Sequence, residues 1–400
     1  MEEHMVSEFN APNPVLFGIG TRKQVGEKLK RFGCAKVLLV YDPGIKAIGV
    51  ADEITSYIEA AGIETVHYGN VQADPPDWSV NEAGELGIRE KVDGVVGIGG
   101  GSSIDSAKAA KMLQTNPPPI NQYFGREGVI TKPSVPLIVI PTTAGTGSEC
   151  TPGGVITDTT VHAKLNIAGV GCQVNLGIVD PELTVGLPPR STAATGFDAF
   201  CHCAESFTSG RPNPYSGVVG KEGMRLVAKY LERAVKNGKE DIEAREGMML
   251  AATLGGIAMS GALCHMSHDI GKSLGAAFGI AHGNACGACL PQVLQAVTPA
   301  VPDRVRFIAE TFGAEVPEDA TNEQLGEIIC ETMKAFMNRI DFPKLSGYGI
   351  SLEEMLAVVP DGVMAQVNGA IKLFGGYGTS PIEVTPELIK DIVTRAYNEN

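Results

Sequence analysis

The chain has 400 residues, enough for one large or two ordinary domains, and 44% of them are apolar. This composition provides sizeable cores and excludes disordered and collagen-like proteins. Acidic side chains outnumber basic ones by 46 to 32, for a net charge of -14. Such a field repels nucleic acid and anionic lipid, so we expect neither as a partner. The N-terminus lacks an apolar signal core, and we expect a cytoplasmic protein.

The first part of the chain alternates β-rich apolar runs with helical patterns. Strands are expected at residues 36–41, 65–68, 94–98 and 135–140, and helices at residues 50–61, 81–91 and 102–113. This alternation predicts a parallel α/β sheet. The strands are almost continuously apolar, which predicts that helices cover both faces of the sheet.

After Leu187 the β-branched runs stop, and helical spacing continues to the C-terminus. Helices are expected at residues 193–208, 214–234, 242–263, 304–311, 322–338, 352–359 and 386–397. The uncharged stretch 273–302 contains several polar residues that are costly in lipid, so we expect it to be a buried helix. The sequence thus predicts an α/β domain at residues 1–187 and an all-helical domain at residues 188–400.

A glycine-rich turn follows the strand expected at residues 94–98. It consists of Gly99, Gly100, Gly101, Ser102 and Ser103. Glycines allow close backbone approach, and a helix N-terminus offers free N–H groups and a positive dipole end, which suits a pyrophosphate. The alternative is a plain strand-to-helix turn closed by a capping box of Ser102 and Asp105. The turn is not the usual G-x-G-x-x-G, because Ser102 occupies the last glycine position.

Two further polar segments follow expected strands. Asp42 ends the run KVLLVY, where it either binds a ribose hydroxyl or caps the turn that follows. The loop after residues 135–140 carries Thr142, Thr143 and Thr146. Because the loops at the carboxyl end of a parallel sheet converge, they favour one extended ligand, such as a dinucleotide.

Four of the seven histidines lie in the helical half, among mostly apolar neighbours. Asp198 and His202 are four residues apart and share a helix face, although such a pair taken alone is more often a hydrogen bond on a helix surface. His265 and His268 are three apart, so one or both can face the same cleft, and His282 precedes a glycine. One carboxylate with three imidazoles suits iron, zinc, nickel or cobalt and leaves a position for a substrate oxygen.

Four motifs in this order resemble the iron-containing (group III) alcohol dehydrogenases. They are GGGSSIDSAKA, TTAGTGSE, TGFDAFCHCAES and the pattern H-x13-H-G from His268 to His282. The resemblance implies a Rossmann-like dinucleotide-binding domain at residues 1–187 and a metal-binding and substrate domain at residues 188–400. It further implies NAD(P) and one divalent metal, Fe²⁺ ahead of Zn²⁺, in the cleft between them, and a homodimer.

The activity that the resemblance implies is an NAD(P)-linked alcohol dehydrogenase or aldehyde reductase for small primary alcohols or diols. Its substrate oxygen binds the metal while hydride passes to or from the nicotinamide. A polyol or hydroxy-acid dehydrogenase, or a transhydrogenase, on the same scaffold is the alternative. A protein that binds metal or nucleotide without turnover is a further one.

The resemblance also implies roles for individual residues. The implied metal ligands are Asp198, His202, His268 and His282. The glycine turn Gly99 to Ser103 would bind the pyrophosphate, and Thr142, Thr143 and Thr146 would line the cofactor. Asp42 would bind the adenosine ribose and repel a 2′-phosphate, so NAD is expected in preference to NADP.

The chain departs from the family at one position. Family members commonly show H-x-x-x-H before the final ligand, and the second His lies near the nicotinamide. Alignment of SLGAAFGIAHG makes His268 the ligand and puts Lys272 at the position of that second His. We expect Lys272 to line the cleft and either join the proton relay or attract a substrate carboxylate, although a surface lysine is the plain alternative. His265 is expected beside the ligands, and a shift in register would make it the ligand.

Overall fold

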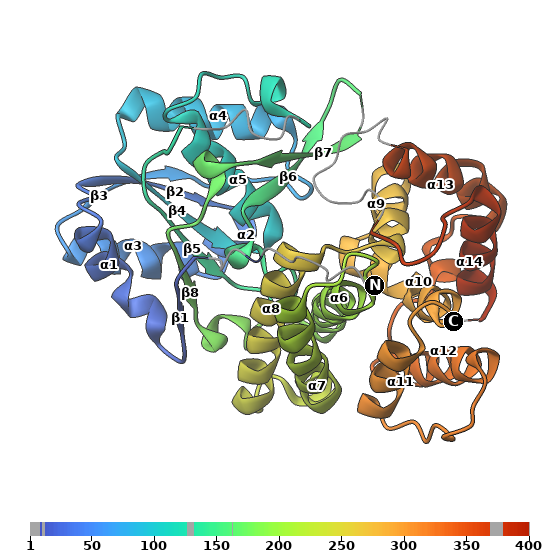
Figure 1. Ribbon diagram of the computed structural model, residues 1–400. Helices are drawn as coiled ribbons and strands as arrows, with labels where there is room; N and C mark the ends of the chain where they lie inside the picture. Colours follow the sequence, from blue (N-terminus) through green and yellow to red (C-terminus); the bar gives the residue numbers. More distant parts are fainter. Residues whose placement is uncertain (1–8, 10–12, 126–131, 162, 369–378, 400) are drawn as a thin grey trace, which may run out of the picture.

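The protein was analysed as a computed structural model that describes residue 9 and residues 13–125, 132–161, 163–368 and 379–399. The chain forms an α/β region followed by a helical region, which lie side by side (Figure 1). Helices α6 (Pro189–Thr208) and α8 (Ile242–Ala262) belong to the helical region and lie next to the α/β region.

Six parallel strands form the sheet of the α/β region, in the order β1-β8-β5-β4-β2-β3. Their bounds are β1 Val15–Phe17, β2 Lys36–Tyr41, β3 Glu64–Tyr68, β4 Gly94–Gly99, β5 Leu137–Pro141 and β8 Leu176–Val179. The expected parallel sheet is confirmed, and β2 to β5 lie within two residues of their predicted bounds. The sequence pattern does not predict β1 and β8, because three or four residues are too few to show a period.

Helices cover the sheet on both faces, as its apolar strands predict. Helices α1 (Val25–Arg31) and α3 (Val50–Ala60) pack on one face, and α4 (Asp77–Glu90) and α5 (Gly101–Leu113) pack on the other. Successive residues of β2 alternate between the two cores, since Val37 and Leu39 face α1 and α3 whereas Leu38 and Val40 face α4 and α5. A short antiparallel hairpin, β6 (Gly153–Asp158) and β7 (Ala163–Ala168), lies beside α5.

The strand order opens a crevice at the carboxyl ends of β2 and β4. Strand β3 lies on one side of β2 and β4 on the other, so the loops after β2 and β4 diverge there. A β-carbon at Gly99 would lie 2.6 Å from Ser103 Oγ and 3.2 Å from Asp42 Oδ2, and the φ of Gly99 is +140°. This position therefore requires glycine, and the predicted cofactor residues of two loops meet at the crevice.

Helices make up the C-terminal region, as the sequence predicts, around a single apolar core. After α6 and α8, the remaining helices are α7 Pro214–Asn237, α9 Met266–Phe278, α10 His282–Val297, α11 Pro302–Thr311, α12 Asn322–Arg339, α13 Leu352–Val367 and α14 Pro386–Glu399. The expectation of one helix over residues 273–302 is wrong. Gly279, at φ +67°, ends α9 in a left-handed conformation, and the chain restarts as α10 at His282.

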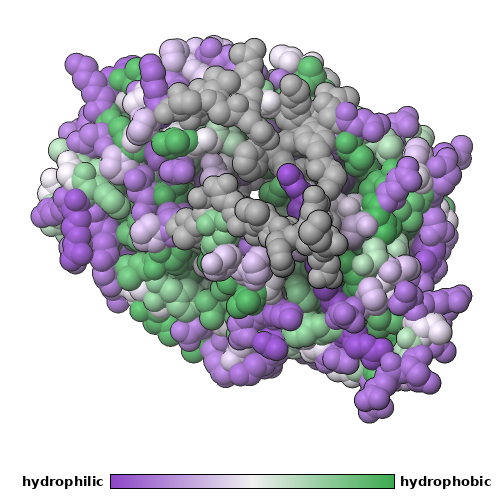
Figure 2. Space-filling view, viewed as in Figure 1, coloured by the Kyte–Doolittle hydropathy of each residue, from purple (hydrophilic) through white to green (hydrophobic). Residues whose placement is uncertain are grey.

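The surface carries both hydrophilic and apolar residues. Figure 2 shows hydrophilic residues over much of the visible face, with hydrophobic patches between them. Scattered exposed apolar side chains of this kind are normal in folded domains. No single helix of the described residues is long and apolar enough to cross a membrane, and α8 and α9 reach that limit only as a pair bent by 107°.

The loop after β5 approaches α8 most closely at Gly147, where backbone meets backbone, and this contact leads to our first prediction. A β-carbon at Gly256 of α8 would lie 2.3 Å from the carbonyl oxygen of Gly147. We expect Gly256→Ala to lower the free energy of unfolding by about 1–3 kcal/mol, because the added methyl group forces the two segments apart. Chemical denaturation measures this change.

The matched control is Gly186→Ala, because nothing lies within 4 Å of a β-carbon built at Gly186. We expect its free energy of unfolding to stay within about 0.5 kcal/mol of the wild-type value. Equal effects of the two substitutions would contradict the close contact between the loop and α8.

Candidate metal and cofactor site

Three helices bring the four predicted metal ligands together. Helix α6 carries Asp198 and His202, α9 carries His268, and α10 begins at His282. The Nε2 atom of each histidine lies 3.9 Å from Asp198 Oδ1. The break at Gly279 lets α10 start beside α9, so that the rings of His268 and His282 are 5.4 Å apart.

These side chains fit one divalent metal ion. Asp198 Oδ1 and His268 Nε2 are buried and have no hydrogen-bond partner among the described residues, which is costly without a cation. Burial lowers the pKa of His268 to about 4, so its imidazole stays neutral, the form that binds metals. A tetrahedral ion with bonds of about 2.0–2.2 Å places two ligand atoms about 3.4 Å apart, close to the observed spacing.

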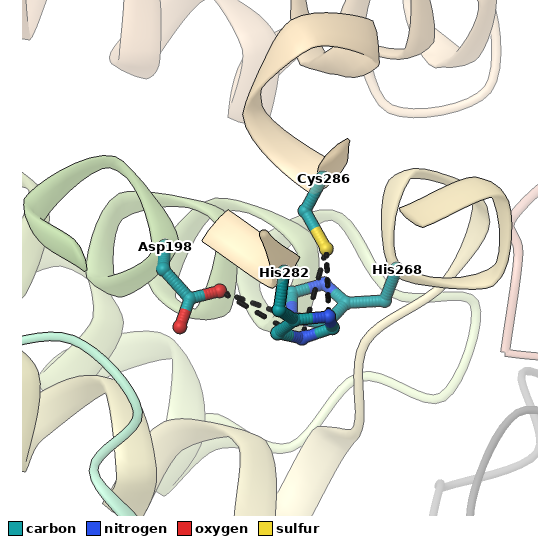
Figure 3. Close-up of side chains that lie close together, drawn as sticks. All are labelled: Asp198, His268, His282 and Cys286. Carbon is teal, nitrogen blue, oxygen red and sulfur yellow. Dashed lines mark hydrogen bonds and ion pairs between the residues drawn. The ribbon is translucent and has the colours of Figure 1, made fainter. Parts of the chain in front are cut away.

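Two thiols lie beside the same donor atoms. The donor atoms of Asp198, His268, His282 and Cys286 all lie within 4.8 Å of one another, and Cys264 forms a second such group with His202 and His268. Figure 3 shows the carboxylate of Asp198 pointing toward the two rings and the Cys286 sulfur directed at them. Sequence reasoning missed Cys286 as a possible ligand, although it follows His282 by one helical turn.

A buried carboxylate that the sequence analysis missed, Glu205, orients the ligand His268. Glu205 Oε2 accepts a hydrogen bond of 2.5 Å from His268 Nδ1, and Oε1 accepts one of 2.7 Å from the backbone N–H of Ser267. Burial acts to raise the pKa of Glu205, but His265 and the bonds from His268 and Ser267 lower it to about 2. With its proton on Nδ1, His268 presents the Nε2 lone pair to the ion.

His265 lies behind this carboxylate and outside the cavity lining. It is fully buried, its Nδ1 lies 3.3 Å from Glu205 Oε1, and its Nε2 lies 2.9 Å from Thr208 Oγ1. It is not among the donor groups that could hold a metal in the described residues. The interpretation of His265 as the ligand is therefore not supported, and the ring lies beside Glu205 on the side away from the cavity.

A cavity of about 340 Å³ joins the glycine turn to the metal cluster. Its lining includes Gly101, Ser102 and Thr146 from the α/β region and Asp198, His202, His268, Lys272 and His282 from the helical region. The ammonium of Lys272 lies 3.9 Å from Asp269 Oδ1. The predicted cofactor residues and metal residues thus border one space, and Lys272 faces it.

The glycine turn leaves the N-terminus of α5 free of a side-chain cap. Gly100 is the N-cap residue, and no side chain in the described ranges accepts a capping hydrogen bond from the first turn. The alternative of a Ser102/Asp105 capping box is wrong, because Asp105 instead accepts hydrogen bonds of 2.7 Å from Ser148 Oγ and 2.9 Å from the N–H of Val155. The first N–H groups of α5 are therefore available for an anion.

Packing between the two loops requires a glycine at position 101 of the turn, whereas Gly100 makes ordinary contact. The N–H of Thr142 donates to the carbonyl of Gly99 at 2.9 Å. A β-carbon at Gly100 would lie 3.5 Å from Thr143 Oγ1, and one at Gly101 would lie 2.8 Å from Thr146 Cγ2. The three threonines therefore lie against the glycine turn.

Asp42 takes the local role that the sequence left open. It is the N-cap of α2 (Pro43–Ala47), and its Oδ1 accepts hydrogen bonds from the N–H groups of Gly44 at 2.8 Å and Ile45 at 3.2 Å. Its Oδ2 accepts one from Ser103 Oγ at 3.2 Å. Capping is thus the interaction seen, and ribose binding by Asp42 stays a prediction.

Comparison with known protein families shows which family the chain belongs to. The family model "Iron-containing alcohol dehydrogenase" matches residues 12–181, and "Fe-containing alcohol dehydrogenase family, C-terminal" matches residues 192–396. The chain belongs to the iron-containing alcohol dehydrogenase family. The resemblance inferred from the motifs is therefore confirmed, and the chain is an alcohol oxidoreductase of this family.

Individual relatives show the same relationship. The chain is 36% identical to the choline dehydrogenase of Bacillus subtilis (strain 168), over 86% of this chain and 85% of that protein. A crystal structure of a 1,3-propanediol oxidoreductase superimposes with a TM-score of 0.91 at 29% identity, covering 98% of this chain and all of that one. The NADH-dependent butanol dehydrogenase A of Thermotoga maritima gives a TM-score of 0.85 at 28% identity, covering 99% of each chain.

The contact between Glu205 and His268 predicts a loss of metal affinity on Glu205→Gln. A neutral amide supports the histidine ligand less well than a carboxylate, so we expect affinity for Zn²⁺ or Co²⁺ to fall about 10–100-fold. Competition with a chromophoric chelator measures it. Glu222→Gln, an exposed change on the neighbouring α7, is the control and should bind as the wild type does. An unchanged affinity in Glu205→Gln would contradict the orienting role.

Proposed function

We propose that the protein is an NAD-dependent alcohol dehydrogenase and aldehyde reductase for small primary alcohols or diols, with one divalent metal, Fe²⁺ ahead of Zn²⁺. The observation that carries this proposal is the single cavity that borders both the glycine turn and the cluster around Asp198. Family membership and the alcohol substrates in the names of relatives support it. A polyol or hydroxy-acid enzyme, or a transhydrogenase, is the weaker alternative.

The proposed division of labour follows the two regions. Residues 1–187 bind the cofactor, and residues 188–400 hold the metal and the substrate. Asp198, His202, His268 and His282 would hold the ion. When bound, the ion polarises the substrate oxygen and the nicotinamide exchanges hydride with the substrate carbon.

On the cofactor side, the uncapped first turn of α5 binds the pyrophosphate through its N–H groups and its dipole. The small residues Gly99 to Ser103 let the phosphates approach the backbone, and Thr142, Thr143 and Thr146 line the cofactor. Asp42, whose Oδ1 also caps α2, binds the ribose with its carboxylate and repels a 2′-phosphate. These roles favour NAD over NADP.

On the metal side, the hydrogen bond to Glu205 keeps the proton of His268 on Nδ1, and His265 packs against Glu205 on the side away from the cavity. Lys272 borders the cavity, where its ammonium either passes a proton to the substrate oxygen or binds a substrate carboxylate. We expect a cytoplasmic enzyme, and the acidic net charge supports the expectation that it binds neither nucleic acid nor anionic membrane. The family resemblance supports a homodimer.

The decisive experiment combines elemental analysis of anaerobically purified protein with a panel of alcohols and aldehydes. Absorbance at the NADH band follows turnover with NAD(H) and with NADP(H). We expect about one metal ion per chain, turnover with short alcohols, and a preference for NAD(H). Cofactor binding without turnover after reconstitution with Fe²⁺ would contradict the proposal. Exchange between hydroxy and oxo acids without net NADH would support the transhydrogenase.

Lys272→Met tests the cation that borders the cavity. We expect kcat/KM to fall at least about tenfold, since a positioned proton donor contributes at least that much. The loss should extend to 1,3-propanediol if the ammonium moves a proton, and be confined to 3-hydroxypropanoate if it binds a carboxylate. Lys272→Arg is the control and should retain carboxylate binding. Unchanged kinetics on both substrates would remove Lys272 from the site.

A further inference from the structure

Cys286 places a fully buried thiol against the metal-binding cluster. Its Sγ lies 3.7 Å from each ring nitrogen of His282 and within 4.8 Å of donor atoms of Asp198 and His268 (Figure 3). An ion with tetrahedral ligands, about 2.1 Å from nitrogen and about 2.3 Å from sulfur, sets these two atoms about 3.6 Å apart. The distance between Sγ and Nε2 therefore matches that of two ligands on one ion.

Local packing explains why the thiol lies there. Cys286 follows His282 by one turn of α10, so the two side chains share a helix face. Across the interface, a β-carbon at Gly271 of α9 would lie 2.4 Å from Cys286 Sγ. The glycine therefore admits the sulfur to the depth of the imidazoles, and a larger residue at position 271 would displace it.

The neighbouring donor atoms lack partners of their own. Asp198 Oδ1 and His268 Nε2 are buried without a hydrogen-bond partner in the described part of the chain. His202 does not belong to the group that includes Cys286 and pairs instead with Cys264 and His268. The group that includes Cys286 therefore shares Asp198, His268 and His282 with the four proposed ligands of the catalytic ion.

We propose that Asp198, His268, His282 and Cys286 form a second ligand set that closes around a thiophilic divalent ion such as zinc or cadmium. This inference rests on the proposed function for the identity of the first set. Thiolate favours zinc and cadmium over ferrous iron, and four protein ligands complete a tetrahedral shell. Such a shell leaves no position for a substrate oxygen, so these ions inhibit the enzyme.

Binding of the ion to the Cys286 sulfur exchanges a proton for a metal bond and changes no oxidation state. Burial, with the nearby carboxylates of Asp198 and Glu205, raises the pKa of the Cys286 thiol, which is therefore protonated when no cation is bound. The entering ion forms a bond to sulfur, and the thiol proton passes to the buffer. The bound ion then has a thiolate ligand, which the proposed ligand set of Asp198, His202, His268 and His282 lacks.

The test uses the whole protein, stripped of metal and loaded with one equivalent of Co²⁺, Zn²⁺ or Cd²⁺. X-ray absorption at the zinc edge of the wild type should show one sulfur at about 2.3 Å, and its absence would overturn the proposal. Co²⁺ and Cd²⁺ should show thiolate charge-transfer absorption in the wild type. This absorption should be lost in Cys286→Ser.

Two matched variants identify the thiol. Cys289→Ser alters a buried thiol in the same helix that belongs to neither donor group, and it should keep the absorption. Cys264→Ser should keep it as well, and loss of the absorption in this variant alone would overturn the assignment to Cys286. The Cd²⁺ concentration that halves Fe²⁺-dependent turnover should rise at least about tenfold in Cys286→Ser, the size of effect typical for a lost ligand contact.

The same preparations separate this proposal from the proposed function. Charge-transfer absorption without turnover on any alcohol would overturn the dehydrogenase assignment and leave the thiol ligand standing. Turnover with Fe²⁺ in a wild type whose zinc spectrum lacks sulfur would overturn the thiol ligand and leave the dehydrogenase assignment standing.

Discussion

The buried carboxylate of Asp198 is the constraint around which the helical region is arranged. Only 3% of the residue is exposed, three imidazoles face its Oδ1 at 3.9 Å, and none of these contacts is a hydrogen bond. A carboxylate in such surroundings is costly unless a cation compensates it. The packing of α6, α9 and α10 therefore makes sense as the frame for an ion, and Glu205 extends this frame one layer outward.

The sequence predicts the parts of the molecule that rest on periodicity. Apolar runs locate β2 to β5, and the spacing of Asp198 and His202 places both on one face of α6. The glycine turn after β4 is recognisable because it combines a strand, three glycines and a helix start. The family resemblance adds His268 and His282, which no periodic pattern links to α6.

The features that escape sequence reasoning depend on tertiary contacts. Gly279 divides a uniformly uncharged stretch into two helices, and one glycine in an apolar run gives no clear signal of a break. Ser102 and Asp105 have the spacing of a capping box, yet Ser148 from the loop after β5 and Val155 from β6 bind Asp105 instead. Glu205 is three residues beyond His202, on the face of α6 shared with the ligands, but its partner lies on α9.

Two adjacent glycines of α8 fix the spacing between the two halves of the site. A β-carbon at Gly255 would lie 3.2 Å from His202 Cβ, and one at Gly256 would meet Gly147 in the loop that carries Thr146. One turn of a single helix therefore sets the distance between the loop that carries Thr146 and the side chain of His202 on α6. A movement of one region against the other therefore has to bend α8 or carry both contacts along.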